Sequence, residues 1–351
     1  MPKETMTPRE RWLAVLNRET PDRVPMDYWA TAEATEKLLK HLGCGYEEML
    51  ERLHIDTPFV VTGRYVGPPE KEPGDIWGLK RKLVDYGGGV YAESVAEPLA
   101  GFKFVEEIED CYIWPSPDYW DYSHLPEAIK GQAHRPIRGG GSEPFLHYKN
   151  LRGEEQAYVD LVENPEIVHY CLDKLFEIAY QDTLRIFEAI PGKVMITYVA
   201  EDLGAQNSLL YSPEHIREFL LPRMKRMMDL TKQHGSRVFH HSDGAIRAIL
   251  PDLIDIGIDV LNPVQWRCAG MEREGLKRDF GDKVIFHGAV DNQHTLPFGT
   301  VEDVRQEVID NYRILGEGGG YILAPCHNIQ VVGPAENVVA MYEAGYEYGW
   351  R

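Results

Sequence analysis

Eight short apolar runs, each followed by polar residues, constrain the fold of this chain more than any other feature. They span residues 24–29, 58–62, 133–137, 193–199, 237–241, 259–263, 284–288 and 321–324, and helical patterns separate most of them. Eight such units in one chain are typical of an α/β fold of the (β/α)8 type. An open doubly wound sheet is the competing architecture, but no G-x-G-x-x-G or Walker loop follows any run. We therefore predict a single (β/α)8 TIM barrel over residues 1–351.

Residues 67–126 depart from this pattern. The stretch is rich in Pro, Gly, Trp and Tyr, and alternating segments at 79–86 and 90–95 flank Gly87-Gly88-Gly89. Alternation on both sides of a glycine turn predicts an antiparallel hairpin. Long insertions of this kind usually line a substrate site. We expect residues 67–126 to form an antiparallel insertion that covers the C-terminal mouth of the barrel.

Charge and cysteine usage narrow the class of function. A net charge of −19 argues against binding to nucleic acid or to an anionic membrane, because both require a basic surface. No apolar run reaches transmembrane length and the N-terminus has no apolar signal core, so we expect a cytoplasmic protein. The five cysteines are scattered and form no C-x-x-C pair, which argues against a disulfide framework.

The run at 237–241 ends on ligand-type side chains. It delivers His241, and Asp243 follows, just before a helical pattern begins. These two residues are two positions apart, so on an extended backbone they point to the same side. The run at 321–324 is followed in the same way by Cys326. If the two strand ends meet, His241, Asp243 and Cys326 form a three-ligand metal site of the kind that zinc prefers.

The same residues also have a purely structural interpretation. Asp243 could cap the following helix, where free N–H groups and the helix dipole favour a carboxylate. The histidines could be ordinary polar residues at a strand end, and Cys326 a small buried residue. Glu201, after the preceding strand, could supply or replace the carboxylate of the metal site. Without a metal, the same acids could act as proton donors in a decarboxylation.

Other polar residues also follow the predicted strands. The catalytic candidates are Tyr198, Gln265, His287 and Asp291, and the substrate-binding candidates are Glu201, Asp202, His240 and Asn292. Gln265 and Asn292 are neutral amides suited to orienting a ligand, and Tyr198 could be a hydrogen-bond donor or an aromatic wall. His287 is suited to orienting Asp291 or a backbone carbonyl. Each of them could instead hydrogen-bond a neighbouring loop.

Nine short motifs occur in a characteristic order along nearly the whole chain. They are Thr7-Pro8-Arg9-Glu10-Arg11, Asp22-Arg23-Val24-Pro25, Ile76-Trp77-Gly78, Trp114-Pro115-Ser116-Pro117, Glu201-Asp202-Leu203-Gly204, His241-Ser242-Asp243-Gly244, Leu261-Asn262-Pro263-Val264-Gln265, Phe286-His287-Gly288-Ala289-Val290-Asp291 and Ala324-Pro325-Cys326-His327-Asn328-Ile329-Gln330. This set resembles the uroporphyrinogen decarboxylase superfamily, and its corrinoid-linked methyltransferase branch more closely than the true decarboxylases. The true decarboxylases carry an arginine-rich R-Q-A-G-R loop after the first strand, whereas residues 28–33 here contain no arginine.

The resemblance also has implications for the site. The methyltransferases of the superfamily bind zinc through an H-x-C pair on strand five and a cysteine after strand eight. His241 and Cys326 match those positions, and Asp243 stands where the first cysteine would be. Aspartate makes the site harder than a thiolate would, which favours an oxygen leaving group over a soft thiol.

Two classes of function follow from the resemblance. The first is a metal-assisted methyltransferase that moves a methyl group between a small substrate and a corrinoid carried by a partner protein. Methoxylated aromatics, methylamines, methylthiols and coenzyme M are the candidate substrates, and the aromatic-rich insertion favours an aromatic ether. The alternative is a cofactor-free decarboxylase of a small carboxylated substrate, with a non-catalytic corrinoid- or tetrapyrrole-binding protein as a third interpretation. The expected partners are the small molecule, the corrinoid protein and a second copy of the chain in a homodimer.

Overall fold

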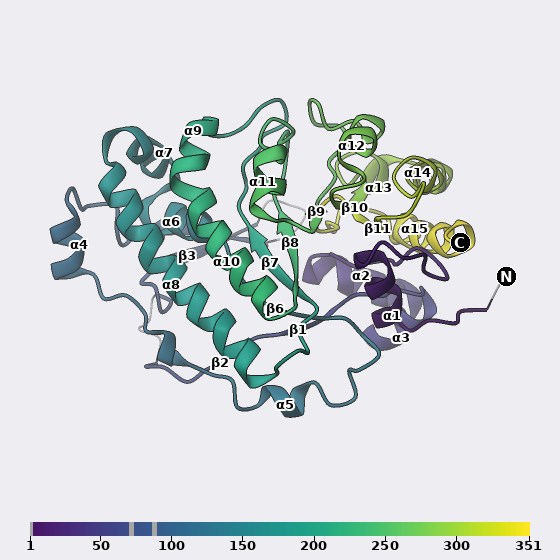
Figure 1. Ribbon diagram of the computed structural model, residues 1–351, viewed down its shortest axis with the longest axis horizontal. Helices are drawn as coiled ribbons and strands as arrows, with labels where there is room; N and C mark the ends of the chain where they lie inside the picture. Colours follow the sequence, from purple (N-terminus) through teal and green to yellow (C-terminus); the bar gives the residue numbers. More distant parts are fainter. Residues whose placement is uncertain (1–2, 70–73, 86–89) are drawn as a thin grey trace.

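A parallel sheet forms the centre of the computed structural model, which describes residues 3–69, 74–85 and 90–351 (Figure 1). The sheet has seven strands in the order β1-β6-β7-β8-β9-β10-β11, and each neighbouring pair is parallel. The strands are β1 (Phe59–Val61), β6 (Ile137–Ser142), β7 (Ile196–Ala200), β8 (Arg237–His241), β9 (Val260–Asn262), β10 (Ile285–Val290) and β11 (Tyr321–Pro325). The predicted α/β class is therefore confirmed.

Residues 24–29, which were predicted as the first strand, hydrogen-bond to the edge of the sheet but form no continuous strand. Met26 bridges Leu323 of β11 in parallel, and the Asp27 N–H donates to the Leu323 carbonyl at 2.8 Å. On the other side, the Asp56 N–H donates to the Met26 carbonyl at 2.7 Å, just ahead of β1. Pro25 has no N–H, which limits the ladder that this segment can form. Residues 24–29 thus lie between β11 and the entry to β1, and the described sheet has seven strands rather than eight.

Helices occupy the connections between the strands of the sheet, and others precede β1 and follow β11. They are α1 (Pro8–Leu16), α2 (Ala32–Leu42), α3 (Tyr46–Arg52), α4 (Val105–Cys111), α5 (Leu125–Ala128), α6 (Pro144–Arg152), α7 (Glu154–Glu163), α8 (Pro165–Ala189), α9 (Pro213–His215), α10 (Leu221–Gln233), α11 (Leu250–Ile256), α12 (Arg273–Phe280), α13 (Thr295–Phe298), α14 (Val301–Ile314) and α15 (Ala335–Tyr348). Thr7 and Glu10 form the capping box of α1. Helices α8 and α10 contact β6 to β8, and α14 contacts β10 and β11 (Figure 1).

A small inner core closes the amino end of the sheet. Trp12 of α1 is fully buried and packs with Ile196, Phe239, Val260 and Ile285, which project from four neighbouring strands. Because strand side chains alternate, the residues two positions further along these strands point to the same side of the sheet. This inner face carries polar side chains at its carboxyl end.

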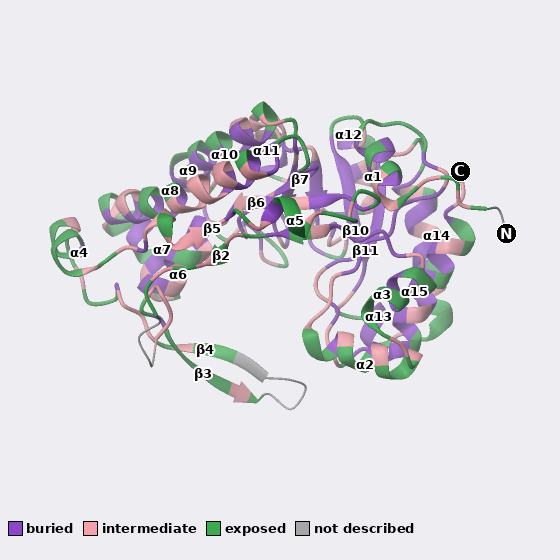
Figure 2. Cartoon of the chain, turned by 90° about the horizontal axis from the view of Figure 1, so that it is seen from below, coloured by how far each residue is buried: buried purple, intermediate pink, exposed green. Residues whose placement is uncertain are grey.

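The region 67–126 contains antiparallel pairing. Strand β3 (Lys80–Asp85) pairs antiparallel with β4 (Val90–Ala96), and β2 (Arg64–Tyr65) pairs antiparallel with β5 (Trp120–Asp121). The predicted turn at Gly87-Gly88-Gly89 lies outside the described residues. In Figure 2 the β3–β4 hairpin extends away from the helices and the sheet. Its placement over the carboxyl ends of the strands stays a prediction.

No helix among the described residues is both long enough and apolar enough to cross a lipid bilayer.

Candidate functional site

A chain of hydrogen bonds crosses the carboxyl end of the inner face. Nδ1 of His241 lies 2.6 Å from Oδ1 of Asn262, and Nδ2 of Asn262 lies 2.7 Å from Nδ1 of His287. Nε2 of His287 lies 3.0 Å from Oδ2 of Asp27. An amide oxygen only accepts and an amide NH2 only donates, so this arrangement assigns the proton of His241 to Nδ1. Nε2 of His241 is therefore left as a free acceptor, which is the form that binds metals.

Asp27 anchors this chain of hydrogen bonds. Its side chain is almost fully buried, and it also accepts hydrogen bonds from the Tyr28 N–H and from Nε1 of Trp29, each at 2.8 Å. Burial raises the pKa of Asp27, but the hydrogen bond from His287, together with those from Thr57 and Trp29, outweighs it and leaves the pKa lowered. An ionised Asp27 holds the Nε2–H of His287 and, through Asn262, the orientation of His241.

Two further ligand-type side chains lie beside Nε2 of His241. One oxygen of Asp243 is 4.0 Å from this nitrogen, and the other is 3.6 Å from Nε2 of His327. The ligand atoms of His241, Asp243 and His327 all lie within 4.8 Å of one another. Oδ1 of Asp243 is buried and accepts no hydrogen bond from the described residues. Two imidazole nitrogens and a carboxylate oxygen are a donor set that suits zinc, so these residues could hold a metal.

The structure does not support a capping role for Asp243. Helix α11 begins at Leu250, and its N-cap is Ile249, so the helix predicted to start directly after Asp243 begins several residues later. Burial raises the pKa of Asp243, while the charges of His241 and His327 act in the opposite direction. Asp243 therefore does not cap α11, and its role as a metal ligand stays a prediction.

Cys326 faces a different part of the rim. Its thiol donates to the Val264 carbonyl at 3.1 Å and is buried, and burial raises its pKa well above the ordinary value. It lines a small separate pocket together with Gln265 and Asp291. Among the described residues, the group that could hold a metal therefore contains His327 where Cys326 was predicted. The role of Cys326 as a ligand stays a prediction.

Three acidic side chains surround the candidate metal ligands. Glu201 is fully buried, accepts a hydrogen bond from the Phe145 N–H at 2.8 Å, and has a pKa raised well above its usual value by burial. Oδ1 of Asp202 lies 3.7 Å from Nε2 of His241 and accepts a hydrogen bond from the Asp243 N–H. The third is Glu143, whose pKa is raised to about 7, first by burial and then by the charges of Asp202 and Asp243, against the lowering effect of His241.

Glu143 is a residue that the sequence analysis missed. It follows β6, which runs from Ile137 to Ser142, whereas the third strand was predicted at 133–137. That placement left the glycines at 139–141 and Glu143 beyond the strand end. A polar residue directly after a strand is the signal that would have identified it.

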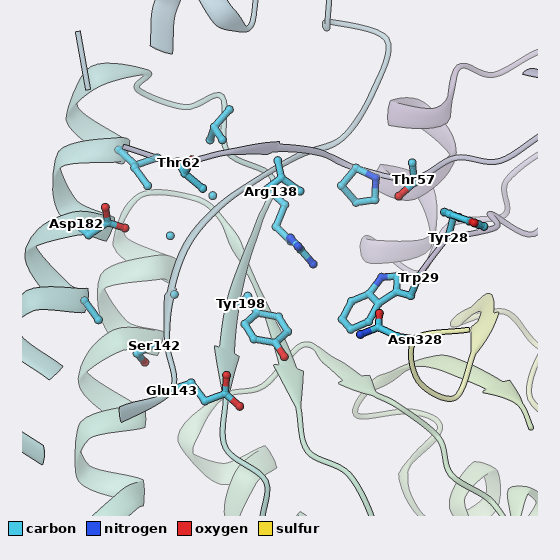
Figure 3. A pocket seen from close by; sticks show the side chains of 18 of the residues that line it. Tyr28, Trp29, Thr57, Thr62, Arg138, Ser142, Glu143, Asp182, Tyr198 and Asn328 are labelled. Atoms are coloured by element: carbon cyan, nitrogen blue, oxygen red, sulfur yellow. The ribbon is translucent and has the colours of Figure 1, made fainter. Parts of the chain in front are cut away.

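A cavity of about 670 Å³ opens beside these residues. Trp29, Tyr198, Arg138, Glu143 and Asn328 line it, and Figure 3 shows the Arg138 side chain pointing toward the space between the Trp29 and Tyr198 rings. The guanidinium carbon of Arg138 lies 5.6 Å from the centroid of each ring. The Trp29 ring also stacks on the His241 ring with centroids 5.9 Å apart. Aromatic side chains thus connect the cavity to the candidate metal ligands.

One wall of this cavity consists of backbone alone. Gly139, Gly140 and Gly141 form part of its lining. Gly141 has a φ of +138°, and a Cβ there would lie 1.8 Å from the Tyr198 carbonyl oxygen. A side chain cannot be accommodated at this position, because β6 approaches β7 too closely.

Several predicted site residues hydrogen-bond the loops around the cavity. Oε1 of Gln265 accepts from the Gly244 N–H at 2.7 Å, and the Asp291 carboxylate lies 2.6 Å from Nε of Arg267. His287 contacts Asp27 and Asn262 rather than orienting Asp291. The catalytic roles of Gln265 and Asp291 stay predictions.

The two remaining substrate-binding candidates lie at the edge of this site. Nδ1 of His240 lies 2.8 Å from the Val199 carbonyl, and burial lowers the pKa of His240 to about 4. Oδ1 of Asn292 is buried and accepts no hydrogen bond from the described residues. Neither residue lines the large cavity. Their proposed contacts with substrate stay predictions.

Comparison with solved structures identifies a related fold. The structure superimposes on a methyltransferase from Methanosarcina mazei with a TM-score of 0.69, and the match covers 98% of this chain and 99% of that chain. The two sequences are 20% identical, so this likeness concerns the fold alone.

Comparison of sequences identifies curated relatives of two kinds. The methylcobamide:CoM methyltransferase MtaA of Methanosarcina barkeri (strain Fusaro) is 31% identical over 213 residues, which are 61% of this chain and 58% of the relative. The uroporphyrinogen decarboxylase of Anaeromyxobacter dehalogenans is 26% identical over 212 residues, 60% of this chain and 54% of the relative. The chain thus spans less than two thirds of the length of these relatives. Residues 133–348 match the family described as Uroporphyrinogen decarboxylase (URO-D). This match includes every strand from β6 to β11, and the chain therefore belongs to the uroporphyrinogen decarboxylase family.

Proposed function

We propose that this protein is a metal-assisted methyltransferase, which moves a methyl group between a small substrate and a corrinoid carried by a partner protein. One observation carries the proposal: His241, held by Asn262, presents a free Nε2 to Asp243 and His327, all within reach of one ion. The relationship to a methylcobamide:CoM methyltransferase at 31% identity supports the same chemistry.

Zinc is the metal that the donor set favours, and His241, Asp243 and His327 would hold it. Cys326 would join these ligands only if its thiol left the Val264 carbonyl and lost its proton. When bound, zinc supplies a Lewis acid that lowers the pKa of a coordinated oxygen or sulfur. Because the set contains a carboxylate and no thiolate, an oxygen substrate such as an aryl methyl ether suits it better than a thiol.

The remaining residues of the site bind and orient the substrate. Trp29 and Tyr198 supply aromatic walls against which a flat ligand can pack. Glu143 has a pKa of about 7, so it can take up or release a proton near neutral pH. Asp27 and His287 act at a distance, because they hold Asn262 and thereby His241 in place.

The proposal includes a closed barrel. Residues 24–29 contact both β11 and the entry to β1, which supports their place as the eighth member of a (β/α)8 barrel spanning residues 1–351. Residues 67–126 would then lie over the carboxyl ends of the strands, where the insertion can restrict access to the cavity.

A cofactor-free decarboxylase is the second candidate. Glu143 favours it, because an acid with a pKa of about 7 can protonate a carbanion at neutral pH without a metal. Arg138 is the one Lys or Arg that lines the described cavity, so a substrate with a single carboxylate would fit this activity better than a tetrapyrrole with many.

Metal analysis combined with two assays separates these functions. The purified chain is expected to bind about one zinc per chain and to transfer a methyl group between a methoxylated aromatic and cob(I)alamin, which is followed by corrinoid absorbance. His241→Ala should lose both properties. Release of CO2 from a carboxylated substrate by metal-free protein, without methyl transfer by the zinc-loaded protein, would overturn the methyltransferase and favour the decarboxylase.

A further inference from the structure

The guanidinium of Arg138 has no anionic partner among the described residues. No ion pair or hydrogen bond of its guanidinium is formed with the part of the chain that the structure describes, although its backbone pairs with Val60 and Ile196 in the sheet. Its half-buried side chain lies beside the Trp29 and Tyr198 rings, at 5.6 Å from each centroid. A cation–π contact uses none of the N–H groups of a guanidinium as conventional hydrogen-bond donors, so those of Arg138 remain available to a ligand.

Other arginines in the interior of the protein have acidic partners within the described chain, unlike Arg138. Arg11 is fully buried and binds Asp22 and Asp56, and Arg152 is buried and binds Asp160. Arg135, three residues before Arg138, donates to the Thr57 carbonyl and faces Glu47. The net charge of −19 shows that acidic residues are in excess, yet none of those in the described part of the chain pairs with Arg138. A partly buried arginine with unused donors in a cavity is suited to an anionic ligand.

The position of Arg138 also limits the shape of that ligand. The Trp29 ring lies between Arg138 and the candidate metal ligands, 5.6 Å from the Arg138 guanidinium and 5.9 Å from the His241 ring. Tyr198 also lies beside both, with its ring 5.6 Å from that of His241. A ligand held by Arg138 would therefore extend along two aromatic faces toward Asp243 and His327. The flat faces of Trp29 and Tyr198 favour a flat, aromatic ligand along that path.

We infer that the cavity binds a small aromatic acid, with its one anionic group at Arg138 and its opposite end toward His241. The class of ligand is a methoxylated aromatic carboxylate. The direction of the methoxy group rests on the proposed methyl transfer, whereas the pairing of the carboxylate with Arg138 rests on the cavity alone.

Calorimetric titration of the chain without corrinoid tests the pairing. The probes are 4-methoxybenzoate and the neutral 4-methoxybenzamide, which differ in charge and little in shape. Wild type is expected to bind the benzoate about tenfold more tightly than the benzamide. Arg138→Gln should reduce that preference to about twofold or less, and Arg138→Lys should keep part of it, because lysine retains the charge without the fork of donors.

Arg226→Gln is the matched control. Arg226 also lies over two rings, those of Phe176 and Tyr180, but it stands outside the cavity. This variant should bind both probes like wild type. Equal binding of both probes by wild type, binding of neither, or the same loss in both glutamine variants would overturn the inference. Tighter binding of 2-mercaptoethanesulfonate than of 4-methoxybenzoate would overturn the aromatic class.

These outcomes are separate from those for methyl transfer. If the charge preference is absent, the proposed methyl transfer still stands with another substrate. If methyl transfer is absent, the proposed anion site at Arg138 still stands. If Arg138→Gln does not fold, the comparison of Arg138→Lys with wild type still decides the result.

Discussion

Asn262 accepts a hydrogen bond from Nδ1 of His241 at 2.6 Å and thereby fixes which nitrogen of that ring faces Asp243. The same amide donates to His287, whose other nitrogen binds Asp27. One side chain thus sets the tautomers of two histidines, and a residue 260 positions away from His287 supports the arrangement. The candidate metal site consequently depends on Asn262, His287 and Asp27, which are not among its candidate ligands.

Replacing Asn262 with alanine should weaken zinc binding about 10- to 100-fold, because His241 loses the partner that holds its proton on Nδ1. The measurement is a zinc titration against a chromophoric chelator. Asn337→Ala is the control, since Asn337 is also buried and donates to two carbonyls, those of Leu296 and Gly299. Equal zinc affinity in the Asn262→Ala variant and wild type would show that the amide does not orient the ligand.

His327→Ala and Cys326→Ser distinguish the observed group from the one that family resemblance implies. Because the Cys326 thiol is hydrogen-bonded to the Val264 carbonyl, we expect Cys326→Ser to retain zinc and His327→Ala to lose most of it. Zinc per chain, measured by atomic emission after gel filtration, decides between them. The reverse result would assign the third ligand to Cys326.

Glu143→Gln should change how stability depends on pH. The pKa of Glu143 is raised to about 7 in the folded protein, so the folded chain retains a proton between pH 4.5 and 7 that the unfolded chain has released. This stability contribution is complete below pH 4.5 and is lost as the pH rises through 7. Its loss should amount to about 2 kcal/mol after discounting for partial solvent exposure.

Urea unfolding at pH 5 and pH 8 measures that loss. The wild type should lose more free energy of unfolding between the two pH values than Glu143→Gln does. The exposed Glu188→Gln should behave like wild type. If wild type and Glu143→Gln lose the same amount, Glu143 does not retain its proton.

Asp56→Asn should destabilise the whole fold. The buried Asp56 carboxylate lies 2.5 Å from Nη1 of Arg11 and 2.7 Å from Nη1 of Arg23, and both arginines are buried. Removing the charge leaves two cations short of an anion, which costs about 3 kcal/mol or more. Denaturant unfolding measures this cost. Asp121→Asn breaks the exposed pair with Arg64 and should destabilise the fold far less than Asp56→Asn, because water and salt screen that pair.

The sequence predicted elements whose local signals agree with the fold. The capping boxes at Thr7 and Thr300 are signals of this kind, because a cap depends on residues within one turn. Seven of the eight apolar runs overlap strands of the sheet, the third by Ile137 alone, whereas the run at 24–29 forms only an isolated bridge. The third run was placed at 133–137, ahead of β6 at Ile137–Ser142, because glycine has low strand propensity and tertiary packing overrides it at 139–141.

The residues of the candidate site were harder to predict from the sequence than the helices and strands. His241 and Asp243 were recognised, since two residues at period two share a side of a strand. Cys326 was predicted as the third ligand, whereas the group in the structure contains His327. The strand ends at Pro325, so alternation no longer tells which neighbour turns inward. Asn262 and Asp27 were missed as site residues, since contacts between such distant positions leave no local pattern.

The glycines at 139–141 decide where the ligand preference of this cavity can be altered. A wall of bare backbone offers no side chain to exchange, and at Gly141 an added Cβ would meet the Tyr198 carbonyl at 1.8 Å. Attempts to redesign the protein for a new substrate should leave that wall intact. Variation belongs at Trp29 and Arg138, whose side chains line the cavity, so that a substitution there changes its shape or charge without adding a Cβ to a glycine.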